Sequence, residues 1–363
     1  MNPSAVPAYL PLPVRPEQIT APWLSAALAD RHPAVVVEEA RVEDILWGTS
    51  TKIRVRLRCN AAGQAADVPP TLIVKGGFEE HSPQMAYMYA SEMRYYRDLA
   101  PRMSLNVPRC WFAASDPGSH QSIVVMDDLV PRGVRFCRVQ QPHTLAEASA
   151  FVDALAQCHA PWWGRPELDD GGELGWVMHP FDEPSWGYYN RYLEPERWQH
   201  YMAQPRGMAV PQVFHDGERM RRMLQGVQHF HAGGVRTLTH GDTHPGNLYI
   251  EADGRAGFLD AQVRRSPWYH DLPYHLIGSL DVPDRRRWEE RLLVRYLAQL
   301  KTHGVRNPPT LDEAFDAFRR VIPYGLFIFL INETRFQTEA TNTGYTLRFG
   351  LAALDHRVED LYS

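Results

Sequence analysis

The sequence predicts an α+β protein made of a β-rich amino-terminal part and a larger, mainly helical carboxy-terminal part. The chain has 363 residues, a length that corresponds to about two domains. Its strand patterns fall almost entirely before residue 128 and its long helical patterns after it. Hydrophobic residues make up 44% of the chain, which is enough for a sizeable core. We therefore expect one domain over 1–128 and a second over 129–363.

The β-rich part is expected to begin with a short helix and to continue as strands. Thr20 is a candidate N-cap of that helix, and Pro22 lies in its first turn, where the fixed angle of proline fits. Residues 35–42 are rich in β-branched side chains. Residues 53–58 alternate apolar side chains with arginines, which is typical of a strand with one solvent-facing side. Residues 60–70 carry no such pattern, so we expect a loop there.

A helix is expected over residues 82–99, with Ser82 as its cap and Pro83 at its first position. The remaining strands of this part are compact apolar runs, at residues 71–75, 110–114 and 122–126.

After residue 128 the patterns are those of helices. Thr144 and Glu147 form a capping box for a helix that runs to about residue 161. Three further helices have apolar faces at helical spacing, at residues 217–231, 284–303 and 311–331. Pro323 is expected to bend or break the last of them.

Composition excludes several classes of protein. The net charge is −5, so the chain has no general attraction for nucleic acid or for anionic membranes. The longest apolar run, residues 324–331, is too short to span a bilayer, and the amino terminus does not resemble a secretory signal. Four widely spaced cysteines indicate reduced thiols in a cytoplasmic protein.

The segment 239–262 carries the residues that indicate chemistry. Asp253 and Gly254, flanked by short apolar runs, are typical of a hairpin with a two-residue turn. In such a hairpin Asn247 and Asp260 face each other, with Cβ atoms about 5 Å apart. Amide and carboxylate oxygens are ligands that Mg²⁺ prefers. The sequence therefore predicts a Mg²⁺ site formed by Asn247 and Asp260.

Asp242 precedes this hairpin in the loop that leads into it. From there its carboxylate can reach a substrate hydroxyl beside the metal and accept the proton. Taken singly, Asp242 is typical of a cap or loop residue and Asn247 of a turn residue. The combination with Asp260 favours the catalytic interpretation.

The ordered set His240-Gly241-Asp242, Asn247 and Asp260 resembles the catalytic and metal-binding loops of protein-kinase-like phosphotransferases, in particular the aminoglycoside phosphotransferase and choline kinase family. The resemblance implies a two-lobed protein-kinase-like fold and ATP- or GTP-dependent transfer of phosphate to a hydroxyl group. It also implies that Asp242 is the catalytic base, that Asn247 and Asp260 hold Mg²⁺, and that His240 supports the loop by hydrogen bonding.

The sequence departs from protein kinases in the same segment. Asp260 is followed by Ala261 and Gln262, where protein kinases have Phe and Gly, and this pattern is similar to ecdysteroid-kinase-like sequences. No Ala-Pro-Glu follows, which argues against a protein substrate. Asp271 resembles the structural aspartate that lies behind the active site in this family.

Lys75 and Glu92 are expected to pair. Lys75 ends an apolar strand, and Glu92 falls within the apolar face of the following helix. A carboxylate on a buried face needs a cation, and Lys75 is the candidate. From the residues alone, a strand-edge lysine and a boundary glutamate are an equal alternative. The family resemblance implies the pair that grips the α- and β-phosphates of the nucleotide.

The resemblance implies two further nucleotide-binding segments. One is a short phosphate-covering loop, which from the residues alone is equally a plain hairpin turn, and the other is a hinge whose backbone bonds the purine. Their residues are Gly48, Thr49 and Ser50 in the loop, and Met126, Asp127 and Asp128 in the hinge.

The acceptor is expected to be a small molecule. The segment 161–201 is rich in tryptophan and tyrosine, which suits an apolar alcohol or a quaternary ammonium group, or a packed core. Acidic residues of the same segment suit a polycation or are simply solvated. We expect a moderately apolar or aminoalcohol-type acceptor, and a monomer or homodimer.

The sequence leaves two alternative functions open. The first is a pseudokinase that binds nucleotide without turnover. The second is a metal-dependent hydrolase in which His240, Asp242 and His244, with His229 and His231, hold Zn²⁺.

Overall fold

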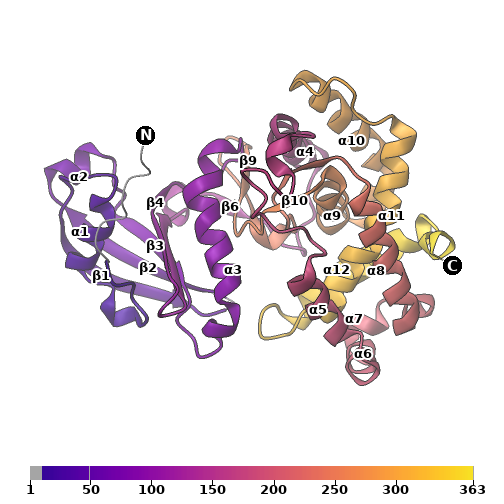
Figure 1. Ribbon diagram of the computed structural model, residues 1–363, viewed down its shortest axis with the longest axis horizontal. Coiled ribbons are helices and arrows are strands. Elements are labelled where there is room, and N and C mark those ends of the chain that lie inside the picture. Colours follow the sequence, from indigo (N-terminus) through magenta and orange to yellow (C-terminus); the bar gives the residue numbers. More distant parts are fainter. Residues whose placement is uncertain (1–9, 49, 363) are drawn as a thin grey trace. The chain divides into compact units, whose positions relative to one another are not determined.

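The computed structural model describes residues 10–48 and 50–362. The chain forms two compact units. The amino-terminal unit consists of Met1–Met103 and Val107–Val134, and the carboxy-terminal unit of Ser104–Asn106 and Arg135–Ser363 (Figure 1). The first is built on a β-sheet and the second is mainly helical, as the sequence predicts. The resemblance implies a nucleotide-binding role for 1–128 and a catalytic and substrate-binding role for 129–363, and both roles stay predictions.

The amino-terminal unit contains one antiparallel sheet of five strands in the order β1-β2-β3-β5-β4. Its strands are β1 (Val37–Leu46), β2 (Thr51–Cys59), β3 (Thr71–Gly76), β4 (Cys110–Asp116) and β5 (Gln121–Asp127). All four neighbouring pairs are antiparallel, and short connections join β1 to β2 and β4 to β5.

The two faces of this sheet carry different partners. Helix α1 (Ala21–Ala29), capped by Thr20, packs its Trp23 and Leu24 into a core with alternate strand residues such as Leu72 and Val74. The residues between them point to the opposite face because strand side chains alternate. On that face Lys75 meets helix α3 (Ser82–Arg94), which lies against the sheet (Figure 1).

Two local expectations are wrong. The segment 60–70 is not only a loop, because Asn60 caps a short helix, α2 (Ala61–Ala65), by accepting the Gly63 N–H at 3.1 Å. Helix α3 includes Ser82 rather than starting after it, and the cap residue is His81. The Ser82 hydroxyl instead accepts the Glu79 N–H at 3.0 Å.

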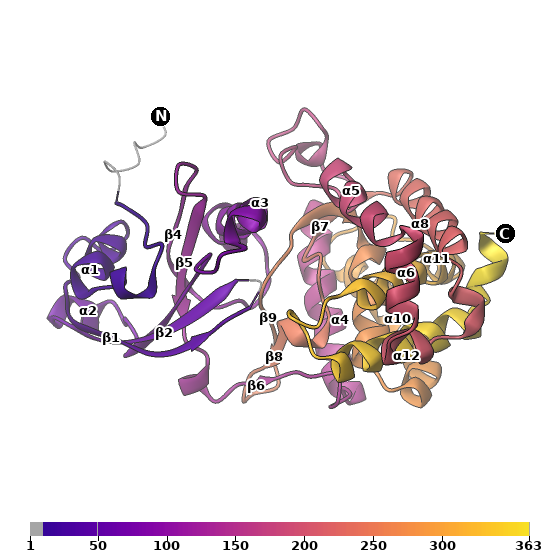
Figure 2. The same ribbon diagram turned by 90° about the horizontal axis from the view of Figure 1, so that it is seen from below.

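The carboxy-terminal unit is built mainly from helices (Figure 2). These are α4 (Leu145–His159), α5 (Glu183–Tyr192), α6 (Pro195–Met202), α7 (Pro205–Met208), α8 (Gly217–Ala232), α9 (Leu272–Ser279), α10 (Val282–Thr302), α11 (Leu311–Ile331) and α12 (Glu339–Asp355). The predicted capping box of α4 is present, and α11 continues through Pro323 as one helix.

Short strands complete this unit. They are β6 (Arg135–Phe136), β7 (Arg236–Thr239), β8 (Leu248–Ile250), β9 (Ala256–Phe258) and β10 (Arg264–Pro267), in two antiparallel sheets of order β6-β8-β9 and β10-β7. The segment between β7 and β10 contains the residues predicted to be catalytic. Throughout 10–48 and 50–362, helices long and apolar enough to cross a membrane are absent.

Candidate active site

The loop after β7 requires a glycine at its second residue. Gly241 has a φ of +86°, which lies in the left-handed region. A Cβ atom placed on Gly241 would come 2.0 Å from the carbonyl oxygen of Gln262. The two backbone segments therefore approach each other so closely that any side chain at position 241 would separate them.

Asp271 fixes this loop from behind. Its carboxylate accepts the backbone N–H of His240 at 2.6 Å and that of Gly241 at 2.8 Å. Its own carbonyl accepts the hydroxyl of Thr243 at 2.9 Å. Asp271 is fully buried, so these bonds are shielded from water. The aspartate that the resemblance places behind the active site thus binds the backbone of the loop.

The charge of Asp271 is stabilised from the helical core. Burial alone would raise the pKa of Asp271, but a hydrogen bond from His159 and the nearby histidines lower it below its usual value. The two nitrogens of His159 lie 3.2 Å from Asp271 Oδ2 and 2.7 Å from the hydroxyl of Tyr296 on α10. Because an ionised carboxylate only accepts, His159 Nε2 donates to Asp271.

His240 connects the two loops of the site. Its Nε2 donates to the carbonyl of Leu259 at 2.9 Å, and its Nδ1 accepts the N–H of Asp242 at 3.3 Å. Burial lowers the pKa of His240, although Asp271 and Asp242 act in the opposite direction. The ring is therefore neutral, with its proton on Nε2. His240 supports the loop by hydrogen bonding, as expected.

The carboxylate of Asp242 is held by three side chains. Asn247 Nδ2 donates to its Oδ2 at 2.9 Å, and the hydroxyl of Tyr274 donates to its Oδ1 at 3.2 Å. His244 Nε2 lies 3.5 Å from Oδ2. The side chain of Asp242 is nevertheless 30% exposed, so a ligand can reach it.

These contacts set the protonation state of Asp242. Burial raises the pKa of the carboxyl, but His244, His240 and the Tyr274 hydroxyl together lower it below its usual value. Asp242 is therefore ionised near neutral pH, in the form that accepts a proton. Its position is determined by Asn247 and Tyr274 rather than by solvent.

The hairpin differs from the predicted one by one residue in register. The strands pair Leu248 with Phe258, and Asn247 pairs with Leu259, whose N–H it accepts at 2.8 Å. The connection is a three-residue loop that closes with Gly254 at φ +86°, not a two-residue turn. Asp260 therefore follows the residue opposite Asn247, and the expectation that the two face each other is wrong.

The chemistry of Asn247 and Asp260 still fits Mg²⁺. Asn247 uses Nδ2 for both the carbonyl and the carboxylate of Asp242, at 3.0 and 2.9 Å, which fixes the amide orientation and leaves Oδ1 for a ligand. Asp260 has a left-handed φ of 52° at the end of the hairpin. One amide oxygen and one carboxylate would complete a Mg²⁺ shell with phosphate and water.

Lys75 and Glu92 form an ion pair within the amino-terminal unit. Lys75 Nζ lies 2.5 Å from Glu92 Oε1, and the two side chains are 4% and 7% exposed. The strand carries Lys75 on the face covered by α3, which is why the two meet. Such a pair is costly to bury, so it points to a role beyond packing.

The predicted phosphate-covering loop connects β1 to β2 in the same unit. Gly48 donates its N–H to Glu79 Oε1 at 3.1 Å. Ser50 is partly buried and directly precedes β2. Thr49 lies outside the described residues. The role of this loop stays a prediction.

The side chains of the predicted hinge have structural partners. Asp127 Oδ1 accepts the indole N–H of Trp111 at 2.8 Å, and Asp128 Oδ2 accepts Arg54 Nε at 2.8 Å. Met126 and Asp127 are paired with β3. The role of this segment in binding a purine, which the resemblance implies, stays a prediction.

The Zn²⁺ hydrolase alternative is wrong for this site. No three His, Cys, Asp or Glu side chains in residues 10–48 and 50–362 are grouped to hold a metal ion. Both ring nitrogens of His240 are used within the loop, and His231 Nδ1 lies 3.0 Å from a carbonyl of its own helix. Strand β7 ends at Thr239, so the following residues do not alternate on one face.

Half of the aromatic residues in the segment 161–201 belong to the core. Trp198 is buried and donates to the carbonyl of His215, and Trp162 and Tyr192 are also buried. Among the acidic residues of this segment, Asp170 forms an ion pair with Arg265. Its carboxylate is therefore already neutralised by a cation of the protein itself.

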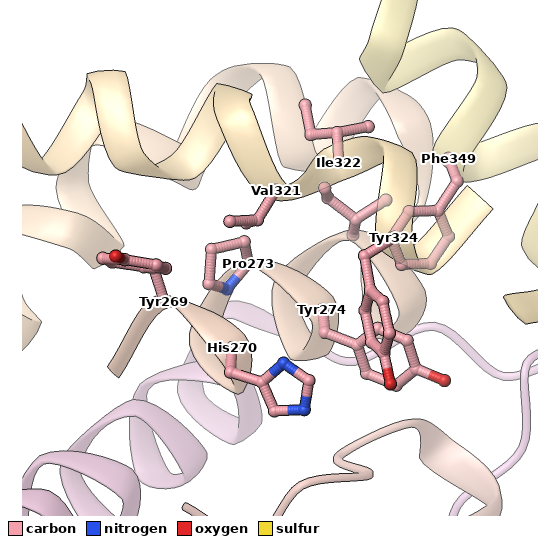
Figure 3. A pocket seen from close by; sticks show the side chains of 9 residues that line it. Tyr269, His270, Pro273, Tyr274, Val321, Ile322, Tyr324 and Phe349 are labelled. Carbon is pink, nitrogen blue, oxygen red and sulfur yellow. The ribbon is translucent and has the colours of Figure 1, made fainter. Parts of the chain in front are cut away.

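The sequence reasoning missed Tyr274 as a residue of the site, and it gave His244 only as a Zn²⁺ ligand of the hydrolase alternative. Tyr274 and Tyr324 lie side by side, with ring centroids 6.1 Å apart and their hydroxyl groups on the same side (Figure 3). The cavity that they line is about 10 Å³, room for no more than one water molecule. The only early signal was that His244 and Tyr274 are polar residues close to the predicted loops in sequence.

Comparison with known proteins identifies the fold. No protein-family model matches the chain, and no curated protein matches it. A solved structure of APH(2")-IIIa, in complex with GDP and kanamycin, matches with a TM-score of 0.52 and 10% identity over 92% of this chain and 98% of that one. The chain shares the fold of this structure, so the predicted two-lobed protein-kinase-like fold is confirmed.

Two further solved structures are similar over most of their length. Ethanolamine kinase from Plasmodium vivax has a TM-score of 0.49 and 8% identity, covering 87% of this chain and 80% of that one. Macrolide 2'-phosphotransferase MphH from Brachybacterium faecium has a TM-score of 0.47 and 17% identity, covering 91% and 98%. Placement in the ecdysteroid-kinase-like branch stays a prediction.

Proposed function

We propose that this protein transfers the γ-phosphate of ATP or GTP to a hydroxyl group of a small molecule. The observation that carries the proposal is the carboxylate of Asp242, which is ionised, reachable, and held by Asn247 and Tyr274. A kinase-like site needs one positioned carboxylate beside a metal, and little other covalent chemistry. The fold shared with small-molecule phosphotransferases supports the same class of reaction.

In this reaction Asp242 accepts the proton of the acceptor hydroxyl while that oxygen forms a bond to the γ-phosphorus. The bond from the γ-phosphorus to the nucleoside diphosphate breaks, and the diphosphate leaves with its electron pair. Asn247 Oδ1 and Asp260 would hold Mg²⁺, which neutralises charge on the phosphates when bound. His240 and Asp271 keep the loop in place throughout.

The nucleotide-binding residues are part of the proposal. Lys75, oriented by Glu92, is proposed to contact the α- and β-phosphates, and backbone groups near the end of β5 are proposed to bind the purine. The loop and hinge residues assigned to these roles are Gly48, Thr49, Ser50, Met126, Asp127 and Asp128. We also propose a cytoplasmic location, which the four free cysteines support.

The substitution Asp242→Asn tests the proposal. It keeps the size of the side chain but removes the base, so phosphate transfer should fall by about 100-fold or more. Thermal stabilisation by Mg·ATP or Mg·GTP should be retained. Transfer is measured by mass spectrometry on a panel of alcohols, as a gain of one phosphate.

The matched control is Asp253→Asn, in the exposed loop of the neighbouring hairpin. Unchanged turnover in Asp242→Asn would overturn the assignment of the base. A wild-type protein that is stabilised by nucleotide, yet phosphorylates no alcohol of the panel, would instead be the pseudokinase.

A further inference from the structure

Arg264 lies next to the loop that carries Asp242. It is the first residue of β10 and pairs with Thr239, the last residue of β7, so the strand register places it beside the start of the loop. A Cβ atom on Gly241 would come 3.2 Å from Cγ of Arg264. The stem of Arg264 therefore runs along the backbone of the catalytic loop.

The guanidinium group of Arg264 is largely unused. Within the described residues it makes one hydrogen bond, from Nη1 to the carbonyl of Val263 at 3.1 Å, and no ion pair. The neighbouring Arg265 instead pairs with Asp170 and donates to the carbonyls of Val177 and Leu168. Arg265 has a structural role that explains its charge, and Arg264 has none.

The surroundings of Arg264 do not compensate its charge. Its field acts on His179, His270, Tyr189 and Tyr324. Burial lowers the pKa of both histidines to about 4, and the positive charge of Arg264 acts in the same direction. These neighbours are uncharged at neutral pH. Arg264 is partly buried, and four of its five N–H groups make no hydrogen bond within the described residues.

Tyr324 lies within the fields of both Arg264 and Asp242. Burial raises its pKa first, Asp242 raises it further, and Arg264 lowers it. Its ring stands beside Tyr274, whose hydroxyl binds Asp242 directly (Figure 3). Arg264 and Asp242 thus both act electrostatically on Tyr324.

We propose that Arg264 binds an anionic group, a carboxylate or a phosphate, of the acceptor whose hydroxyl is deprotonated by Asp242. This inference rests on the proposed function and specifies its substrate class, a hydroxylated organic acid or phosphate ester. A guanidinium fork binds either anion through two parallel hydrogen bonds.

Pairs of acceptors that differ only in the anionic group test this proposal. The probes are glycerate and glycerol 3-phosphate against glycerol, and phenyllactate against 3-phenyl-1,2-propanediol. Their affinities are measured by calorimetry in the presence of Mg·ADP, for the wild type and for Arg264→Gln. The control is Arg236→Gln, which removes a charge from the neighbouring strand, where Arg236 lies 3.9 Å from Asp169.

The wild type should bind at least one anionic probe about tenfold more tightly than its neutral counterpart. Arg264→Gln should remove this preference, and Arg236→Gln should keep it. The proposal is overturned if no anionic probe is preferred, or if the preference survives in Arg264→Gln.

Two further measurements are needed. One distinguishes an anionic group of the acceptor from the phosphate of the nucleotide, and the other tests the acceptor proposal separately from the proposed function. A loss of Mg·ATP affinity in Arg264→Gln, with the acid preference intact, would assign Arg264 to the transferred phosphate and overturn the acceptor proposal. Transfer to neutral or amine-bearing alcohols without acid preference would overturn this inference and leave the proposed function standing. A preference for acids in binding, without any transfer of phosphate, would overturn the proposed function and leave standing the binding of an anionic group by Arg264.

Discussion

Gly241 shows how one residue type determines the geometry around Asp242. Its backbone combines a left-handed φ with a close approach to the carbonyl of Gln262. The motif His240-Gly241-Asp242 can be identified from the sequence. The reason for the glycine cannot, because the carbonyl that excludes a side chain belongs to a segment that only the folded chain brings near.

Alanine substitutions at two glycines separate these two requirements. Gly254 has the same φ of +86° but an open environment, so Gly254→Ala should cost only the backbone strain, about 1–2 kcal/mol. Gly241→Ala adds the steric conflict and should cost about 2–5 kcal/mol, with a large loss of turnover. Urea unfolding and steady-state rates measure both. Equal stability losses in the two variants would contradict the role given to Gln262.

Tyr274 is expected to tune the base. Its hydroxyl stabilises the ionised form of Asp242, so Tyr274→Phe should raise the pKa of Asp242. Because the base acts when ionised, the acidic limb of the kcat profile should move to higher pH, by up to about one unit. Activity at low pH is thus lost first.

A pH profile of turnover checks this expectation. The matched control is Tyr269→Phe, whose hydroxyl donates to the carbonyl of Phe230 and does not contact Asp242. A merely structural role for Tyr274 would lower the rate at all pH values and leave the limb in place.

At the scale of elements, β3 and α3 meet at a buried ion pair. The pairing of Lys75 with Glu92 could be predicted because each residue breaks an apolar pattern, and a buried charge needs its opposite. The irregular end of the helix could not be predicted. The last residues of the expected helix, Tyr95–Leu99, form a π-helical turn after α3, and nothing in the amphipathic pattern distinguishes the two.

Removing one partner of this pair should destabilise the protein. Lys75→Met leaves Glu92 buried without its cation, which should cost about 3–5 kcal/mol and weaken binding of Mg·ATP. The double variant Lys75→Met with Glu92→Met should recover most of the stability but not the nucleotide binding. Urea unfolding and nucleotide-dependent thermal shifts measure the two effects.

Lys301→Met, at the exposed end of α10, serves as the control and should change neither quantity. If Lys75→Met bound nucleotide as the wild type does, the phosphate-binding role of Lys75 would be refuted.

The hairpin between β8 and β9 marks the limit of pattern-based register. Asp253 and Gly254 correctly indicate a hairpin, but they suit a two-residue turn and a three-residue loop with a closing left-handed glycine equally well. The three-residue loop pairs Asn247 with Leu259, so Asp260 lies one position beyond the residue opposite Asn247. Both residues were identified, and their mutual geometry was not.

At the scale of the whole molecule, the α+β division and the helices α4, α8, α10 and α11 were predictable from hydrophobic periodicity, whereas α12 was not predicted. Strands β6, β7 and β10 were not, because they contain only two to four residues and are defined by distant partners. Helices α5 and α6 are also missed, since they are only ten and eight residues long and each buries only two side chains. The position of Arg264 could not be predicted either, because it depends on the pairing of the short strands β10 and β7.

Buried histidines should make the fold sensitive to acid. His143 is stacked on Phe151, with ring centroids 5.0 Å apart, and its burial lowers its pKa to about 3. His275 behaves in the same way, also with a pKa lowered by burial to about 3. The unfolded chain binds a proton at each ring below about pH 6.5, whereas the folded chain does not. Stability should therefore be full above that pH and fall as the pH decreases.

The substitution His143→Phe should reduce this dependence. Between about pH 6 and 4 each such histidine contributes about 1.4 kcal/mol per pH unit, so the variant should show a slope smaller by about that amount. Urea unfolding across this range measures the slope. His303→Gln, at an exposed position, should leave it unchanged, and an identical slope in His143→Phe would contradict the expectation.

Asp271 has a consequence for the motions of the molecule. The amide groups of His240 and Gly241 are bound to a buried carboxylate that also binds His159, at the end of α4. Opening the loop would leave that carboxylate without two of its donors in a place that water does not reach. Local opening of the loop that carries Asp242 therefore has a high free-energy cost. We expect its exposure to be coupled to the unfolding of the helical unit rather than to the fluctuations of a surface loop.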